Sequence, residues 1–152
     1  DKVIIDFIGR LKNATNDEAL TFDGGNCPDI IPVFALACCM RRGRTRIINI
    51  SRLRIKECDR LFATAQELSK MGADIRAEED SLIIEGVTKL RGASVDTHND
   101  HRMAMTLAIA STVADGEVKI SDAQSVSKSY PDFFEVFESL GGKLKYINRR
   151  TQ

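Results

Sequence analysis

The sequence has few aromatic residues and no excess charge of either sign. Trp is absent and aromatic residues make up 6% of the chain, which leaves little surface for stacking on nucleic-acid bases. Its 22 Lys and Arg balance 22 Asp and Glu, which argues against binding nucleic acid or an anionic membrane through bulk charge. Hydrophobic residues at 43% and charged residues at 29% are typical of a globular chain. We therefore expect an aliphatic core in one domain, or part of one, within these 152 residues.

Signals for a membrane helix, secretion, a disulfide or a metal are also missing. The longest apolar run, residues 30–40, is broken by Pro32 and is shorter than the ~20 residues of a membrane helix. No signal peptide is recognisable at the N-terminus. The four cysteines form no CxxC pair, and His98 and His101 have no third ligand at a metal-binding spacing. We therefore expect reduced thiols in a cytoplasmic protein with no metal, no cofactor, no nucleic-acid partner and no membrane partner.

Hydrophobic periodicity and turn residues predict that helices and strands alternate along the chain. The predicted strands are residues 3–7, 19–22, 46–50, 74–76, 81–85, 118–121 and 144–147. The predicted helices are residues 27–43, 57–71, 100–114 and 132–140. The fold class is therefore α/β (α+β).

The order of these elements repeats. Residues 67–75 align with residues 136–144, Gly43 aligns with Gly116, and Lys56 aligns with Lys128. Self-similarity at a period of about 70 residues indicates an internal duplication. The alternative is chance, since helix ends look alike in any α/β chain. We predict two repeats, of about residues 19–86 and 87–147.

Basic residues gather near the predicted helix starts, namely Lys56, Arg60, Arg102 and Lys128. The helix dipole is positive at that end and disfavours cations. Cations are favoured there when an anion lies between them and the free backbone N–H groups. The sequence therefore predicts a site for a small polyanion bearing phosphate or carboxylate groups. The alternative is a set of solvated charges with local partners, such as Glu57 with Arg60.

Two acidic residues, Asp29 and Glu57, lie among these cations in the sequence. A pair of carboxylates beside a cationic pocket can supply a proton donor and a proton acceptor. Either one could instead be a helix cap or a charge partner.

Four sequence blocks occur in order along the chain. They are CPD at residues 27–29, LRIKECDR at 53–60, NDHRMAM at 99–105 and SKSYP at 127–131. Their order and spacing, from about residue 23 to residue 144, resemble the 5-enolpyruvylshikimate-3-phosphate synthase family. The resemblance implies an enolpyruvyl transferase-like repeat domain, with about two βαβαββ-type repeats and parallel helices packed under mixed sheets.

The reaction that the resemblance implies belongs to the shikimate pathway of aromatic amino-acid biosynthesis. The enolpyruvyl group of phosphoenolpyruvate moves to the 5-hydroxyl of shikimate 3-phosphate, and phosphate is released through a tetrahedral intermediate. Asp29 would bind the shikimate hydroxyls and accept the hydroxyl proton, Lys56 would contact the same substrate, and Glu57 would protonate the methylene carbon of phosphoenolpyruvate. The residues implied to hold phosphoenolpyruvate are Arg60, Arg102 and Lys128, with His101 beside them.

The resemblance also implies that part of the protein is missing. Residues 1–152 would be the C-terminal portion of one synthase domain, and the partner N-terminal domain would complete the site, so the chain is expected to be inactive alone. Arg52 stands near a position that often carries a substrate-binding Asn, and its role stays open. Two alternatives remain: a UDP-N-acetylglucosamine enolpyruvyl transferase, and a non-catalytic anion-binding module.

Overall fold

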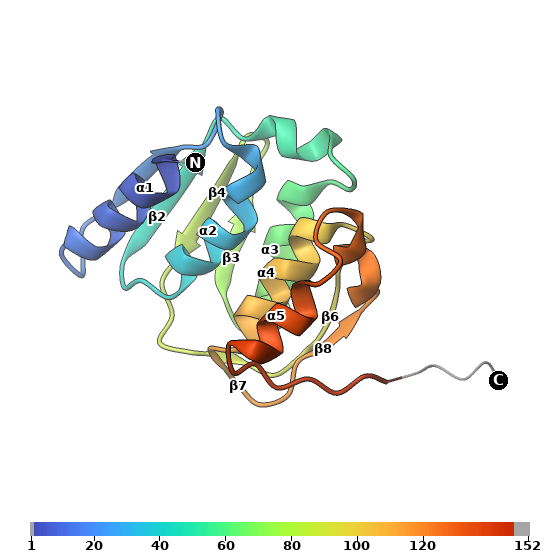
Figure 1. The fold of residues 1–152 in the computed structure, drawn as a ribbon. Helices are drawn as coiled ribbons and strands as arrows, with labels where there is room; N and C mark the ends of the chain where they lie inside the picture. Colours follow the sequence, from blue (N-terminus) through green and yellow to red (C-terminus); the bar gives the residue numbers. More distant parts are fainter. Residues whose placement is uncertain (1, 148–152) are drawn as a thin grey trace.

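The computed structural model describes residues 2–147 and has a mixed α/β fold, as predicted (Figure 1). Its helices are α1 (Lys2–Asn13), α2 (Ile31–Cys39), α3 (Arg60–Lys70), α4 (His101–Ser111) and α5 (Phe133–Ser139). Its strands are β1 (Leu20–Asp23), β2 (Arg44–Ile48), β3 (Asp74–Ala77), β4 (Ser81–Glu85), β5 (Leu90–Arg91), β6 (Ser94–Asp96), β7 (Ala114–Asp115) and β8 (Lys119–Ser121). The 3-10 turns η1 (Pro28–Ile30), η2 (Ser51–Ile55) and η3 (Ala123–Lys128) connect several of them.

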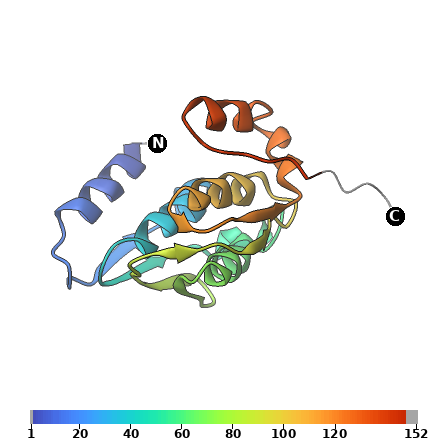
Figure 2. The same ribbon diagram turned by 90° about the horizontal axis from the view of Figure 1, so that it is seen from below.

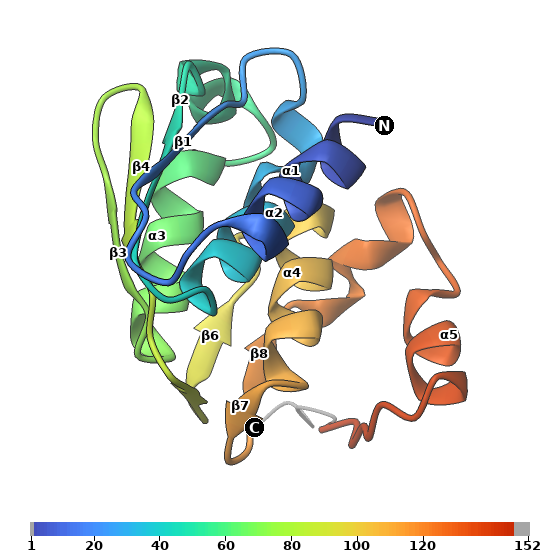
Figure 3. The same ribbon diagram turned by 90° about the vertical axis from the view of Figure 1, so that its left-hand side faces the viewer.

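The strands form one mixed sheet and two short parallel pairs. The mixed sheet has the order β1-β2-β4-β3, with β1 and β2 parallel and the other neighbours antiparallel. The pairs are β5 with β7 and β6 with β8. Helices α2, α3 and α4 contact one another, and α2 and α3 also contact the mixed sheet. Figure 2 shows α1 (blue) and α5 (red) outside the layers that the mixed sheet and α2 to α4 form, and Figure 3 shows α2 beside α4.

The parallel strand pairs β1–β2 and β6–β8 have the same register. Leu20 faces Thr45 across β1 and β2, and Ser94 faces Lys119 across β6 and β8, so the partners are 25 residues apart in both pairs. Glycines with a positive φ, which residues with a Cβ rarely adopt, follow the helices α2 to α5 at Gly43, Gly72, Gly116 and Gly141. These correspondences support two internal repeats of about residues 19–86 and 87–147, which stay a proposal.

The prediction of a strand at residues 3–7 is wrong, because this segment lies within α1. Ile4, Phe7 and Leu11 are spaced for one face of a helix. Phe7 is buried on that face, while Ile4 and Leu11 pack partly against the core. The β-branched residues near the N-terminus favour a strand, but the apolar side chains that pack on the core recur with the 3.6-residue period of a helix.

The strand predicted at residues 144–147 does not form either. Tyr146 and Ile147 are exposed, and no strand of residues 2–147 pairs with this segment. A strand depends on a hydrogen-bonded neighbour, which the apolar pattern alone cannot supply. Strands β5, β6 and β7 were not predicted from the sequence, because strands of two or three residues show no measurable periodicity.

The core is mostly aliphatic, as expected, with one aromatic cluster. Phe7, Phe22 and Phe34 come from α1, β1 and α2, and each pair of ring centroids is 4.8 Å apart. This cluster holds α1 against the edge of the sheet. Among the described residues, no helix combines the length and the apolar character needed to cross a bilayer.

We expect Phe34→Ala to reduce the free energy of unfolding of this chain by about 3–5 kcal/mol, because the substitution opens a cavity among buried rings. Phe62→Ala is the matched control, since Phe62 on α3 is 52% exposed, and it should cost less than about 1 kcal/mol. Urea denaturation followed by circular dichroism measures both. Equal losses in the two variants would contradict the packing described for the cluster.

Candidate functional site

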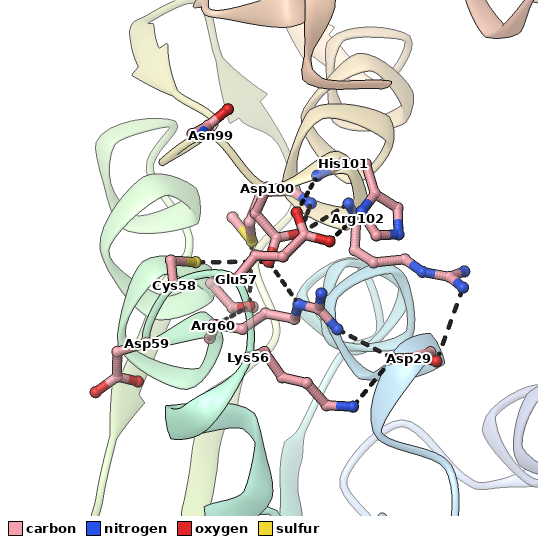
Figure 4. Close-up of polar contacts among 12 residues, drawn as sticks. Asp29, Lys56, Glu57, Cys58, Asp59, Arg60, Asn99, Asp100, His101 and Arg102 are labelled. Carbon is pink, nitrogen blue, oxygen red and sulfur yellow. Dashed lines mark hydrogen bonds and ion pairs between the residues drawn. The ribbon is translucent and has the colours of Figure 1, made fainter. Parts of the chain in front are cut away.

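The structure brings the predicted site residues together at the start of α4, in a network that consists of two neighbouring sets of polar contacts (Figure 4). They come from segments far apart in the sequence: η1, the loop between η2 and α3, the first turns of α3 and α4, and the end of η3. One set joins Asp29 to Lys56, Arg60 and Arg102, and the other joins Glu57 to His101 and Lys128. The two sets lie side by side because His101 and Arg102 are consecutive residues of α4. Their contact with a ligand stays a prediction.

Arg60 is the most buried member of the network, at 2% exposure. Its guanidinium donates from Nε to Asp100 Oδ2 at 2.9 Å and from Nη1 to Asp29 Oδ1 at 3.1 Å. Asp100 is 0% exposed. Each charge of such a buried pair needs the other, because neither is solvated by water. Arg60 therefore ties the start of α4 to η1.

Asp100 is a residue of this site that the sequence analysis missed. One carboxylate oxygen accepts hydrogen bonds from the backbone N–H groups of Arg102 (2.8 Å) and Met103 (3.3 Å), and so caps α4. The other oxygen pairs with Arg60 and accepts from Cys58 Sγ at 3.6 Å. Burial, with Asp100 next in importance, raises the pKa of the Cys58 thiol to about 12. An Asp immediately before a predicted helix is a capping signal, but the sequence does not reveal the second partner.

Glu57 also contacts the start of α4. Its Oε2 accepts from the backbone N–H of His101 at 3.3 Å and lies 3.5 Å from Lys128 Nζ. Its Oε1 lies 2.6 Å from His101 Nδ1, but the two atoms lack the alignment of a hydrogen bond. Within residues 2–147, the ion pairs of Glu57 are with His101 and Lys128 and not with Arg60, so the local pair considered from the sequence does not form.

The predicted cations do not all lie at helix starts. Only Arg60 and Arg102 lie in the first turn of a helix, whereas Lys56 directly follows η2 and Lys128 ends η3. Lys128 donates to the carbonyl oxygen of Asn99. At α4 the anions beside the backbone N–H groups are the chain's own carboxylates, Asp100 and Glu57. These carboxylates account for the cations near α4 without any ligand.

Asp29 is the acid that meets the most cations. Its carboxylate lies 3.6 Å from Lys56 Nζ, 3.1 Å from Arg60 and 3.8 Å from Arg102. Burial by itself would raise the pKa of Asp29, but Lys56, Arg102 and Arg60 together outweigh it and lower the pKa. Asp29 is therefore ionised at neutral pH and can accept a hydrogen bond from a hydroxyl.

The network has a small excess of positive charge. Four cations, Lys56, Arg60, Arg102 and Lys128, face three carboxylates, Asp29, Glu57 and Asp100. Within the described residues 2–147, Arg102 Nε is buried without a hydrogen-bond partner, which is costly unless a ligand supplies one. A hollow of about 220 Å³, lined in part by Asn26 and Asp29, adjoins this cluster. A larger hollow of about 420 Å³, lined in part by Arg46 and Asp80, contains none of the predicted site residues. None of the four cations lines either hollow, so the charge balance of the cluster, and not a hollow, is what would favour a small anion.

A cation fits the cluster less well. Glu57, Asp100 and His101 place possible ligand atoms within 4.8 Å of one another. The oxygens of Asp100 already accept from Arg60 and from the start of α4, and Lys128 lies beside Glu57. A metal ion would have to compete with these positive groups.

The fold and this cluster define an α/β protein with a cluster of mixed charge at the junction of several elements. Residues 17–137 match the model of one protein family, EPSP synthase (3-phosphoshikimate 1-carboxyvinyltransferase). The chain therefore belongs to the EPSP synthase family.

Individual relatives agree with this assignment. The chain is 51% identical to a 3-phosphoshikimate 1-carboxyvinyltransferase of Clostridium botulinum (strain Alaska E43 / Type E3), over 97% of this chain and 37% of the relative. It is 53% identical to the one of Clostridioides difficile (strain 630), over 91% of this chain and 32% of the relative. A solved EPSP synthase from Acinetobacter baumannii superposes with a TM-score of 0.71 at 30% identity, over 76% of this chain and 27% of that one. The chain thus spans about a third of the length of these curated relatives.

We expect Arg60→Met to lower the free energy of unfolding by about 3–5 kcal/mol, because it leaves the buried Asp100 carboxylate without its counter-charge. Arg102→Met serves as the control, since Arg102 is partly exposed and its ion pair with Asp29 is long at 3.8 Å. That control should cost at most about 1 kcal/mol. Denaturant melts of this chain without ligand measure both, and a small loss for Arg60→Met would contradict the structural role of the pair.

The lowered pKa of Asp29 predicts a pH dependence of stability. A carboxyl group whose pKa is lowered by folding stabilises the folded chain above its ordinary pKa of about 4, and this contribution is lost as the pH falls through the lowered value. The difference in unfolding free energy between the unsubstituted chain and Asp29→Asn should therefore be constant from pH 7 to about pH 5 and shrink below about pH 4. Urea melts at pH 7, 5, 4 and 3 test this, and a difference that grows on acidification would refute it.

Proposed function

We propose that this chain supplies part of the active site of an enzyme that transfers the enolpyruvyl group of phosphoenolpyruvate to the 5-hydroxyl of shikimate 3-phosphate. The observation that carries the proposal is the network around Asp29 and Glu57, in which two acids lie among cations that exceed them in charge. Membership of the EPSP synthase family supports it. Phosphoenolpyruvate is a small polyanion with a carboxylate and a phosphate, the groups that such cations bind.

The two acids have different surroundings, which suit different tasks. Asp29 is held ionised by three cations, so it can bind the shikimate hydroxyls and accept the proton of the 5-hydroxyl as this oxygen attacks C2 of phosphoenolpyruvate. Glu57 lies beside His101 and Lys128 and would deliver a proton to the methylene carbon. The tetrahedral intermediate would then lose phosphate while Glu57, now a carboxylate, takes a proton back from the methyl group, which re-forms the C2=C3 double bond of 5-enolpyruvylshikimate 3-phosphate. The proton on Asp29 would leave with the phosphate.

The cations would stabilise the negative charge on the carboxylate and the departing phosphate of phosphoenolpyruvate during this reaction. Arg102 has a buried Nε without a partner, and Lys128 is half-exposed beside Glu57. Arg60 uses Nε and Nη1 on the two aspartates, and we assign its remaining nitrogen to phosphoenolpyruvate. Lys56, beside Asp29, would contact the shikimate substrate. Preorganised charges of this kind stabilise a transition state without reorganising.

The chain spans about a third of its relatives, so we propose that other parts of a synthase-length protein complete the site. The N-terminal domain of such a protein would then be its partner, and residues 1–152 would show no turnover alone, because substrates need groups from both sides. Cys27, Cys38, Cys39 and Cys58 are free, which fits a reducing compartment such as the cytoplasm. The family match favours this activity over transfer to UDP-N-acetylglucosamine.

A chimeric synthase tests the proposal. Residues 17–137 would replace the matching segment of the Clostridium botulinum relative, which is 51% identical to this chain. The chimera should release phosphate from shikimate 3-phosphate and phosphoenolpyruvate, and the isolated chain should not. A folded chimera without turnover that still binds phosphoenolpyruvate would favour the anion-binding module instead.

In the same chimera, Glu57→Gln should lower turnover by at least about 100-fold, because the amide keeps the shape of the side chain but cannot deliver a proton. The dissociation constant for phosphoenolpyruvate should change by less than about threefold. Steady-state phosphate release and equilibrium titration give the two numbers. Near-normal turnover would leave Glu57 as a structural partner of the start of α4 only.

A further inference from the structure

A second buried charge on α3 holds the same loop as Arg60. Glu67 is 0% exposed and lies seven residues after Arg60, which is two helical turns and therefore the same face of the helix. Its Oε2 accepts from the backbone N–H of Asp96 at 2.9 Å, and its Oε1 lies 2.8 Å from Nε2 of His98. Lys70 Nζ contacts both oxygens at 2.9 and 2.8 Å. Residues 96–100 are thus held by α3 at both ends.

The segment between these two contacts has an unusual backbone. His98 and Asn99 both have a left-handed φ, at 53° and 55°, and Asp100 N–H donates to the carbonyl of Thr97 at 3.0 Å. This is the pattern of a tight turn that favours Gly, Asn or Asp, and a His in it is strained. The backbone N–H of His98 donates to Asp96 Oδ1 at 2.6 Å. The ring of His98 contacts Glu67, which lies outside the turn. A strained turn of this kind persists only when contacts with the surrounding structure hold it.

Glu67 can give that support because it is ionised. Burial would raise the pKa of Glu67, but the hydrogen bonds from Lys70, Asp96 and His98 lower it overall. An ionised carboxylate only accepts hydrogen bonds, so Nε2 of His98 carries the proton of this contact. Neither Glu67 nor His98 belongs to the network around Asp29, and neither has a part in the mechanism described above.

The turn positions the groups on which the candidate site depends. It ends at Asp100, which caps α4 and pairs with Arg60. Its Asn99 carbonyl receives Lys128, and the residues after it are His101 and Arg102. We propose that Glu67 and His98 form a positioning pair that fixes this turn and thereby the placement of Arg102 and Lys128 for anion binding, an inference that rests on the proposed function.

The test uses four variants of the chimera and of this chain: Glu67→Gln, His98→Ala, His98→Gln and the double variant of Glu67→Gln with His98→Ala. In Glu67→Gln a single amide oxygen has to accept the hydrogen bonds that Lys70, Asp96 N–H and His98 donate to two carboxylate oxygens. His98→Gln keeps an N–H donor near the position of Nε2, whereas His98→Ala removes it, and both place an ordinary side chain at the same left-handed φ. Glu85→Gln is the control, because Glu85 makes an exposed ion pair with Arg44, its cross-strand neighbour on β2 of the mixed sheet.

We expect Glu67→Gln and His98→Ala each to raise the KM for phosphoenolpyruvate by about tenfold or more, because a displaced loop misplaces the binding groups. The double variant should be no worse than the worse single variant, since the two residues act as one unit. His98→Gln and Glu85→Gln should stay close to the unsubstituted protein.

Amide hydrogen exchange of this chain, without ligand, separates the inference from the proposed function. The amides of Asp96 and Arg102 should exchange at least about tenfold faster in Glu67→Gln and His98→Ala. A chimera without turnover would overturn the proposed function while leaving this readout intact. Unchanged exchange at Arg102, additive losses in the double variant, or a lower melting temperature with unchanged KM would overturn the positioning pair.

Discussion

The buried ion pair between Arg60 and Asp100 is the interaction on which the candidate site depends. Arg60 starts α3 and Asp100 caps α4, so the pair fixes the starts of two helices relative to each other. The same guanidinium reaches Asp29 in η1. A buried pair seldom adds much stability compared with apolar packing, but breaking it is costly. Its value here is geometric, because three segments far apart in the sequence meet at one side chain.

Helix α3 acts as a rigid support for the loop before α4. Arg60 holds the end of the loop at Asp100, and Glu67, two turns later, holds its beginning at Asp96 and His98. The two buried charges have opposite signs, and each is matched by its own partners. A loop fixed at both ends can keep a strained turn and present the residues that follow it in a constant place. The anion-binding groups that we propose are therefore placed in part by Glu67, which need not touch a ligand.

In the ligand-free chain the site is held together by its own charges. Asp29 and Glu57 are the acids that we propose for catalysis, and they also neutralise the cations around them. An incoming anion would compete with these carboxylates for Lys56, Arg102 and Lys128. Such competition would place the acids next to the bound substrate, where a proton donor and acceptor are needed. The acids and cations then form one electrostatic unit, in which a change to one member alters the surroundings of the others.

The sequence by itself determined the α/β class, most of the helices and the residue types of the site, because periodicity and capping are local properties. Lys56, Glu57 and Arg60 are neighbours in the chain, so their association needed no structure. Tertiary structure decided what depends on distant partners. Residues 2–13 form the helix α1 because Phe7 packs on the core, and residues 144–147 form no strand because no strand of residues 2–147 pairs with them. The carboxylates of Asp100 and Glu57 accept hydrogen bonds from the backbone N–H groups at the start of α4. Tertiary structure also buried Glu67, whose partners in the loop before α4, Asp96 and His98, lie 29 and 31 residues away in the chain, a separation at which no sequence pattern indicates contact.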